Sequence, residues 1–245
     1  MSYVLRSNTN WIISEFLPNE DSDITLILLD WLPSNISCKR DVMQKLASFW
    51  YSSIAPRYRW TWESEWTFLD HNPSFDIIEI IETIRNWEFK DLYNSVTYKL
   101  PSKKIVVVWV SFWWIVAIDC INKLEGNDKC VLLSPLCDMV TFTHDLKDVR
   151  DFVKQWFWRA YNFSLEDWNN MVDGNLFKTD YDLIKSNANK IHLIYDEKDS
   201  SILENDLLQF CERTNITNIE KLNWYGHLSY TKRDDDIYEL IHKII

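Results

Sequence analysis

The stretch KIVVVWVSFWWIVAID, residues 104–119, decides the fold. Its first half is a continuous apolar run rich in β-branched residues, which predicts a buried strand, and its second half has the spacing of an amphipathic helix. One serine, Ser111, stands at the junction between the two. Three tryptophans, Trp109, Trp113 and Trp114, surround this junction, where a sharp turn normally requires small residues. The stretch therefore predicts a strand, a tight turn and a helix, with side chains that such a turn does not easily accommodate.

Apolar strand-like runs alternate with helical patterns on both sides of this stretch. Such an alternation is typical of an α/β protein in which crossover helices connect the strands of a mainly parallel sheet. We therefore expect an α/β fold with a mostly parallel sheet of about eight strands flanked by helices. The predicted strands cover 24–30, 51–56, 103–110, 129–135, 189–196 and 219–223, and the predicted helices cover 38–49, 74–86, 112–124, 203–214 and 234–245.

The segment 138–189 interrupts this alternation, because its sequence is helical, aromatic and acidic. We interpret it as a short helical cap that is inserted over the sheet. The rest of the chain would then form one core in two parts, 1–137 and 190–245. A chain of 245 residues with 47% hydrophobic content is large enough to bury the core of such a domain.

The composition argues against several classes of partner and cofactor. The formal net charge is −11, and no run of lysine or arginine is long enough to form a cationic stripe, so nucleic acid is not an expected partner. The five cysteines are scattered and contain no C-x-x-C pair, which predicts neither a disulfide framework nor a zinc site. No window approaches the roughly 18 apolar residues of a membrane span, and the first residues lack the apolar region of a secretion signal. We expect a cytoplasmic protein that uses no metal and no cofactor.

Glycine is scarce and tryptophan is abundant in this chain. Average usage of about 7% predicts roughly 17 glycines at this length. The sequence has 3 glycines and 14 tryptophans, which together reach that number. We therefore read each unusual tryptophan as if it stood at a glycine position.

Three stretches acquire a recognisable form when glycine takes the place of tryptophan. Residues 109–114 become G-V-S-F-G-G, which contains the G-x-S-x-G nucleophile elbow, a strained strand-to-helix turn that exposes a serine Oγ. Residues 28–33 become L-L-D-G-L-P, similar to a strand-end segment that supplies a backbone N–H to an oxyanion hole. The run 50–66 becomes G-Y-x-x-x-A-P-x-Y-R-G-x-G-E-S-E-G. Its glycine positions are occupied by Trp50, Trp60, Trp62 and Trp66.

With these motifs in this order, the chain resembles the α/β-hydrolase superfamily, in the branch of small esterases, acylglycerol lipases and serine-aminopeptidase-like hydrolases. The resemblance covers about residues 11–245 and is weakest in the predicted cap. It implies the α/β-hydrolase fold and a serine hydrolase that cleaves a carboxylic ester or related acyl bond through an acyl-enzyme intermediate. The substrate would be a small molecule, and no cofactor or metal is implied.

The catalytic triad of this family runs Ser, Asp, His along the chain. The resemblance therefore implies Ser111 as the nucleophile and His227, in NWYGHLSY, as the general base. Asp199, in LIYDEKDSS, would be the acid that holds the histidine tautomer. The backbone N–H groups of Leu32 and Phe112 would stabilise the oxyanion.

Three positions depart from the family pattern. Asp30 stands where histidine is usual, Arg57 where aspartate is usual, and Asp196 where the acid turn normally has glycine. The first two affect loop geometry and the surroundings of the oxyanion hole. None of the three removes a member of the implied triad.

Other assignments of the same residues remain open at this point. Asp199 is also suited to cap the helix that follows it, in which case Asp196 or Glu197 would be the acid. The spaced tryptophans of RWTWESEW, residues 59–66, are also compatible with a platform that stacks on sugars.

The activity has alternatives as well. The chain could be an aminopeptidase-like or thioester hydrolase of the same fold. If Trp109 and Trp113 disrupt the elbow, it would instead be a non-catalytic binding module.

Two explanations of the tryptophans compete. Either glycines were replaced deliberately, or a gene in which UGA encodes glycine was translated with a code in which UGA encodes tryptophan. Both readings of UGA occur among bacterial lineages. We favour mistranslation, because it explains why the substitution runs in one direction and affects only part of the glycines. Trp168 has no glycine signature and is expected to be genuine. The codons predicted to be UGA are those of Trp31, Trp60, Trp62, Trp66, Trp109 and Trp113.

Overall fold

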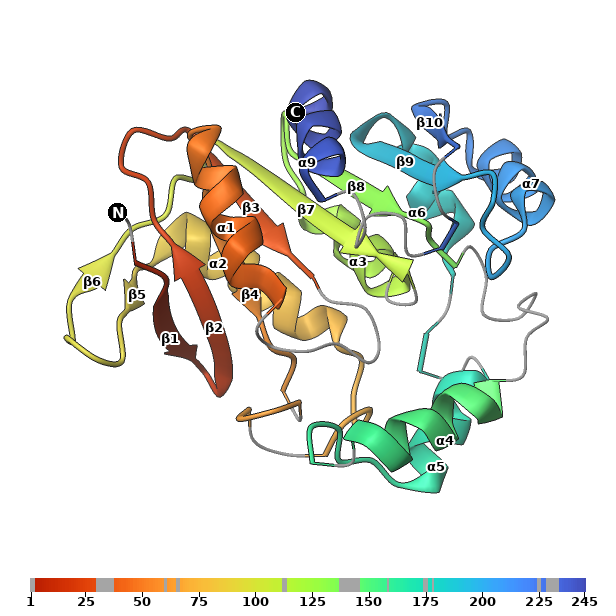
Figure 1. Ribbon diagram of the computed structural model, residues 1–245, viewed down its shortest axis with the longest axis horizontal. Coiled ribbons are helices and arrows are strands. Elements are labelled where there is room, and N and C mark those ends of the chain that lie inside the picture. The colour runs from red at the N-terminus through yellow and green to blue at the C-terminus, as the bar shows by residue number, and fades with distance from the viewer. Residues whose placement is uncertain are drawn as a thin grey trace.

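An eight-stranded sheet forms the centre of the described structure, with strand order β1-β2-β4-β3-β7-β8-β9-β10 (Figure 1). The pairs β1–β2 and β2–β4 are antiparallel, and every other neighbouring pair is parallel. The predicted fold class is therefore confirmed. The strands are β1 (Leu5–Thr9), β2 (Ile12–Leu17), β3 (Ile24–Leu28), β4 (Ser52–Pro56), β7 (Lys104–Val110), β8 (Lys129–Leu133), β9 (Ile191–Asp196) and β10 (Ile219–Leu222).

The structure is a computed structural model. A short antiparallel pair, β5 (Phe89–Lys90) and β6 (Thr97–Tyr98), forms a second, two-stranded sheet.

The structure describes residues 3–29, 38–59, 61–64, 67–111, 114–136, 146–157, 159–173, 176–177, 179–223, 226–227 and 234–245.

The residues of β7 alternate between the two faces of the sheet. Ile105, Val107 and Trp109 belong to one buried cluster, and the residues between them belong to the other. A strand with both faces covered is apolar throughout, which is why its sequence reads as a continuous run. The face of Trp109 is covered by α2 (Ser74–Asn86), α3 (Trp114–Cys120), α6 (Tyr181–Ser186) and α7 (Glu204–Thr214), and the opposite face by α1 (Cys38–Ser48) and α9 (Asp234–Ile244).

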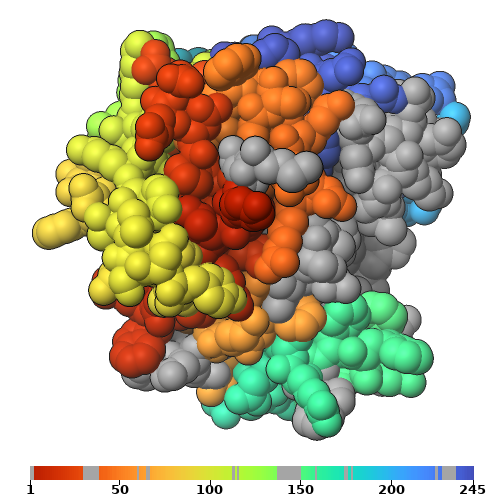
Figure 2. All heavy atoms as spheres, turned by 60° about the vertical axis from the view of Figure 1, so that its left-hand side comes forward, coloured from red at the N-terminus to blue at the C-terminus, as the bar shows by residue number. Residues whose placement is uncertain are grey.

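Two helices from the segment predicted to be a cap, α4 (Leu146–Phe157) and α5 (Leu165–Val172), lie away from the sheet (Figure 1). The chain that joins them is tied to the loop after β4 by backbone hydrogen bonds. Trp62 N–H donates to the carbonyl of Ala160 at 2.8 Å, and Phe68 N–H donates to that of Asn162 at 2.5 Å. Figure 2 shows these helices, in green, against the orange segment that follows β4. We retain 138–189 as the proposed cap between the core parts 1–137 and 190–245.

Three cysteines of the described residues, Cys120, Cys130 and Cys211, are buried free thiols. Burial raises the pKa of the Cys130 thiol to about 12 and that of Cys211 to about 11. These side chains therefore stay protonated near neutral pH and pack as small apolar groups. In the described part of the chain, no helix is both long enough and apolar enough to cross a membrane.

Candidate active site

Ser111 lies in the turn between the end of β7 at Val110 and the start of α3 at Trp114. Its φ is +59°, a left-handed conformation that residues other than glycine rarely adopt. Such strain is typical of a nucleophile elbow, where a buried strand turns directly into a helix and the serine side chain stands clear of both. The backbone conformation of Ser111 is therefore the one that the elbow motif predicts.

His227 lies against Ser111 although 116 residues separate them in sequence. Its Nε2 is 2.8 Å from Ser111 Oγ, and its Nδ1 is 2.8 Å from Asp199 Oδ2. A carboxylate can only accept, so Nδ1–H donates to Asp199 and Nε2 is left to accept the hydroxyl proton of Ser111. The structure thus brings the three predicted triad residues into one hydrogen-bonded chain.

The carboxylate of Asp199 is buried and held by the turn that follows it. Its second oxygen, Oδ1, accepts from the backbone N–H groups of Ser201 at 2.8 Å and Ile202 at 2.9 Å. Helix α7 begins later, with Leu203 at its N-cap, so Asp199 does not cap it. With one oxygen fixed by the backbone, the other is directed at His227.

The two alternative acids make other contacts. Asp196 accepts a hydrogen bond from the backbone N–H of Lys198 at 2.9 Å. Glu197 forms an ion pair with Lys221 at 3.1 Å on the surface. The hydrogen bond between His227 and Asp199 therefore favours the assignment of Asp199 over both.

Parallel pairing explains why these distant residues meet. β3, β7, β8 and β9 run in the same direction, so their carboxyl ends lie at one edge of the sheet. Ser111 follows β7 and Asp199 follows β9 at this edge. Leu29, just beyond β3, donates its N–H to the carbonyl of Val108 at 3.0 Å, so the end of β3 lies beside β7.

Gly226 brings the backbone next to His227, which we call the histidine loop, close to the backbone next to Asp199, which we call the acid loop. Its φ is +87°, and a Cβ at this position would lie 2.8 Å from the carbonyl oxygen of Lys198, the residue before Asp199. Only glycine fits both the conformation and the space. Sequence analysis does not assign Gly226 this role, because the only signal is a glycine next to the histidine.

Several predicted residues lie outside the described residues. Both proposed oxyanion donors, Leu32 and Phe112, belong to this group, and so does Asp30. The same holds for four of the motif tryptophans, Trp31, Trp60, Trp66 and Trp113. The oxyanion hole therefore remains a prediction.

Arg57, which stands at a usual aspartate position, is part of a charge cluster. Its guanidinium pairs with Glu15 at 3.1 Å and with Glu63, and Glu15 also binds Arg40 at 2.7 Å. Burial lowers the pKa of Arg57, whereas the two carboxylates act to raise it. Only Arg57 and Glu15 are buried in this cluster, while Glu63 and Arg40 are about half exposed, so the departure is accommodated by one buried ion pair that is extended to the surface.

The aromatic residues of the proposed cap pack on one another and on the loop after β4. Phe68 meets Tyr161 edge to face at 5.1 Å, and Phe163 lies 5.1 Å from Trp168. Trp62 is half-buried and packs edge to face against Tyr161 at 6.5 Å. Trp168 is buried within this cluster.

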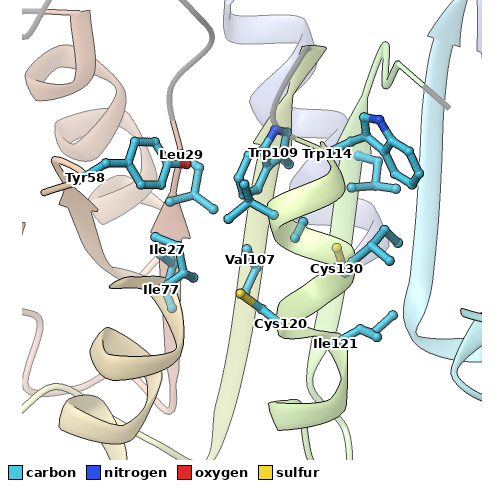
Figure 3. Close-up of a cluster of buried hydrophobic side chains, with 14 of the residues drawn as sticks. Ile27, Leu29, Tyr58, Ile77, Val107, Trp109, Trp114, Cys120, Ile121 and Cys130 are labelled. Atoms are coloured by element: carbon cyan, nitrogen blue, oxygen red, sulfur yellow. The ribbon is translucent and has the colours of Figure 1, made fainter. Parts of the chain in front are cut away.

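Trp109 and Trp114 are fully buried at the ends of β7 and α3 that flank Ser111 (Figure 3). Trp109 lies near Tyr58 at 6.5 Å between ring centroids, and Trp114 meets Phe210 edge to face at 5.1 Å. Neither indole N–H has a hydrogen-bond partner among the described residues. A buried donor without a partner destabilises a protein by about 1–3 kcal/mol.

Within the described part of the chain, no three His, Cys, Asp or Glu side chains gather in an arrangement that could hold a metal ion.

The chain matches no protein-family model and no curated protein.

Solved structures resemble the chain over nearly its whole length. The esterase Pf2001 of Pyrococcus furiosus superposes with a TM-score of 0.66 at 16% identity, covering 99% of this chain and 89% of that one. The 2-hydroxy-6-oxo-6-phenylhexa-2,4-dienoate hydrolase of Rhodococcus sp. strain RHA1 gives 0.67 at 14% identity, covering 100% and 99%. XC6422 of Xanthomonas campestris, described as a member of the α/β serine hydrolases without a lid, gives 0.60 at 14%, covering 98% and 92%. At these identities the likeness shows the fold.

Proposed function

We propose that this chain, whose fold is that of the α/β-hydrolases, is a serine hydrolase that cleaves a carboxylic ester or related acyl bond of a small molecule. The observation that carries the proposal is the hydrogen-bonded chain from Ser111 Oγ through His227 to Asp199, with both links at 2.8 Å. A serine, a histidine and a buried carboxylate in this geometry are the elements of nucleophilic acyl transfer.

The proposed reaction has two halves. Ser111 Oγ attacks the acyl carbonyl while His227 Nε2 takes the hydroxyl proton, and Asp199 stabilises the imidazolium that forms. Collapse of the tetrahedral intermediate breaks the bond to the alcohol, which receives the proton from His227. Water, deprotonated by His227, then attacks the acyl-enzyme and releases the carboxylic acid together with free Ser111. The backbone N–H groups of Leu32 and Phe112 are the proposed donors to the oxyanion.

Activity assays need a form of the protein in which the motif tryptophans do not obstruct the site. We call it the glycine-restored protein, with glycine at Trp31, Trp60, Trp62, Trp66, Trp109, Trp113 and Trp114.

The glycine-restored protein is expected to hydrolyse p-nitrophenyl esters of short acids. A panel of ester, thioester and aminoacyl-anilide substrates separates the proposed esterase from a thioester hydrolase or an aminopeptidase-like enzyme. Reaction with none of them, in a folded protein that a serine-directed fluorophosphonate also fails to label, would favour the non-catalytic binding module.

The contact at Gly226 predicts that Gly226→Ala in the glycine-restored protein lowers kcat. A Cβ against the Lys198 carbonyl would push the histidine loop from the acid loop, and misplacement by about 1 Å costs on the order of 10²-fold in rate. KM is expected to stay nearly unchanged, because substrate contacts are not altered. The measurement is a steady-state comparison of kcat and KM on one p-nitrophenyl ester.

Gly126 offers a matched control for this substitution. It also has a positive φ, +45°, but a Cβ there would meet nothing within 4 Å. Gly126→Ala should lower stability slightly and leave kcat intact. An equal loss of kcat in both variants would mean that Gly226 acts only through general stability.

A further inference from the structure

Three of the eight tryptophans that the structure describes have a positive φ: Trp11 at +73°, Trp50 at +67° and Trp62 at +57°. Both described glycines, Gly126 and Gly226, also have a positive φ. A bulky side chain in this region is an outlier, since Cβ crowds the neighbouring backbone, whereas glycine enters it without cost. These three tryptophans thus have a backbone conformation that glycine would enter without cost, as does Leu69 at +70°.

Trp11 belongs to none of the catalytic motifs. It is the second residue of the two-residue loop that joins β1 to β2, because Thr9 pairs with Ile12 across the hairpin. Asn10 and Trp11 have φ values of +46° and +73°. Positive φ at both central residues is the mark of a type I′ turn, whose preferred sequence is Asn-Gly. Asparagine is present in its expected place, and tryptophan stands where glycine is expected.

Trp50 lies in the turn that follows helix α1. Its N–H donates to the carbonyl of Ala47 at 3.0 Å, and Tyr51 N–H donates to that of Leu46 at 3.2 Å. These two bonds define a Schellman motif with Trp50 at the left-handed position, which is usually glycine. The indole is 66% exposed, so packing does not explain why tryptophan is there.

We infer that positions 11 and 50 are built for glycine, which at position 50 agrees with the motif run 50–66, and that the exchange of glycine for tryptophan extends, at position 11, to a structural turn outside every motif. A deliberate change aimed at the active site would not reach the β1–β2 hairpin. Reading UGA as tryptophan would, because it acts on codons without regard to position. The native chain would therefore carry glycine at 11 and 50.

Trp87 provides a matched control. It is the residue directly after helix α2 and is 69% exposed, whereas Trp50 is the second residue after α1. Its φ is −132°, an extended conformation open to any residue. Trp50 and Trp87 thus share high exposure near the carboxyl end of a helix and differ in backbone conformation.

The test is thermal unfolding of the glycine-restored protein and of its glycine and alanine variants at positions 11, 50 and 87. Alanine removes the exposed indole but keeps Cβ, so the difference between glycine and alanine isolates the backbone conformation. Trp11→Gly and Trp50→Gly should each melt at least about 2–4 °C above the corresponding alanine variant. At position 87 glycine should be no better than alanine, since glycine there only loosens the unfolded chain.

The inference would be overturned if the glycine and alanine variants at positions 11 and 50 melted at equal temperatures. It would also be overturned if glycine raised the melting temperature over alanine by the same amount at position 87. A second measurement does not depend on folding. The gene should have UGA at codons 11 and 50, and UGG at either codon would overturn the inference as well.

Discussion

Soluble protein that hydrolyses esters is the expected result when glycine replaces seven of the eight motif tryptophans, all except Trp50, to give the glycine-restored protein. The chain with tryptophan at these positions, which we call the written chain, should express poorly or lack esterase activity. The measurement is the yield of soluble protein and the initial rate of p-nitrophenol release for the written and glycine-restored proteins. Equal rates would show that these tryptophans are tolerated and that the glycine interpretation is wrong.

The physical reason lies in the cost of each indole. Trp109 and Trp114, which flank Ser111, are fully buried, and their indole N–H groups find no partner among the residues that the structure describes. Overpacking at such a turn destabilises by about 1–3 kcal/mol, and a non-glycine residue at positive φ, as at Trp62, by a similar amount. A domain is stable by only about 5–15 kcal/mol in total, so several such positions together remove most of that margin.

Trp168 supplies the opposite control. Its side chain is buried in the aromatic cluster of α5 and packs on Phe163. Trp168→Gly would remove this packing and place glycine inside a helix, which costs about 3–5 kcal/mol for the side chain and about 1 kcal/mol for the backbone. This variant should therefore unfold at a lower temperature, whereas glycine at the motif positions should stabilise the protein. Stabilisation by Trp168→Gly would mean that loss of any tryptophan helps.

Loss of activity by Ser111→Ala and Asp199→Asn is the second large effect expected. In the glycine-restored protein, Ser111→Ala removes the nucleophile and should reduce kcat by about 10⁴-fold or more, with the fold retained. Asp199→Asn should cost on the order of 10⁴-fold, because an amide facing Nδ1 favours the wrong tautomer of His227. Both magnitudes follow serine-hydrolase triads of the same geometry.

Glu197 is the matched control for the acid. It lies two residues from Asp199 in the same turn and pairs with Lys221 at 3.1 Å. Glu197→Gln should therefore leave kcat nearly unchanged. A large loss in this variant, with little loss in Asp199→Asn, would move the acid role to Glu197.

The order of strands and helices around the central stretch is predictable from sequence, because buried parallel strands read as continuous apolar runs. The β1–β2 hairpin is not predicted, and its turn shows why. Asn-Gly between two strands is a strong hairpin signal, and with Trp11 in place of glycine that signal is absent. If tryptophan stands in place of glycine as we propose, the exchange that obscures the motifs also obscures a strand pair.

The triad residues are predictable as candidates, because their motifs occur in family order, but their meeting depends on parallel pairing that brings β7 and β9 to one edge. Two features could not be predicted. Arg57 departs from the family pattern, and only the fold shows that Glu15 on β2 neutralises it. The approach of Gly226 to Lys198 likewise joins segments that sequence alone does not place together.

The most direct test of the central claim is peptide mass spectrometry of the glycine-restored protein after reaction with a fluorophosphonate. We predict one covalent adduct, on Ser111, and its loss when His227→Ala removes the base that activates the hydroxyl. An adduct on another residue, or none on a protein that still hydrolyses esters, would contradict the assignment of Ser111 as the nucleophile.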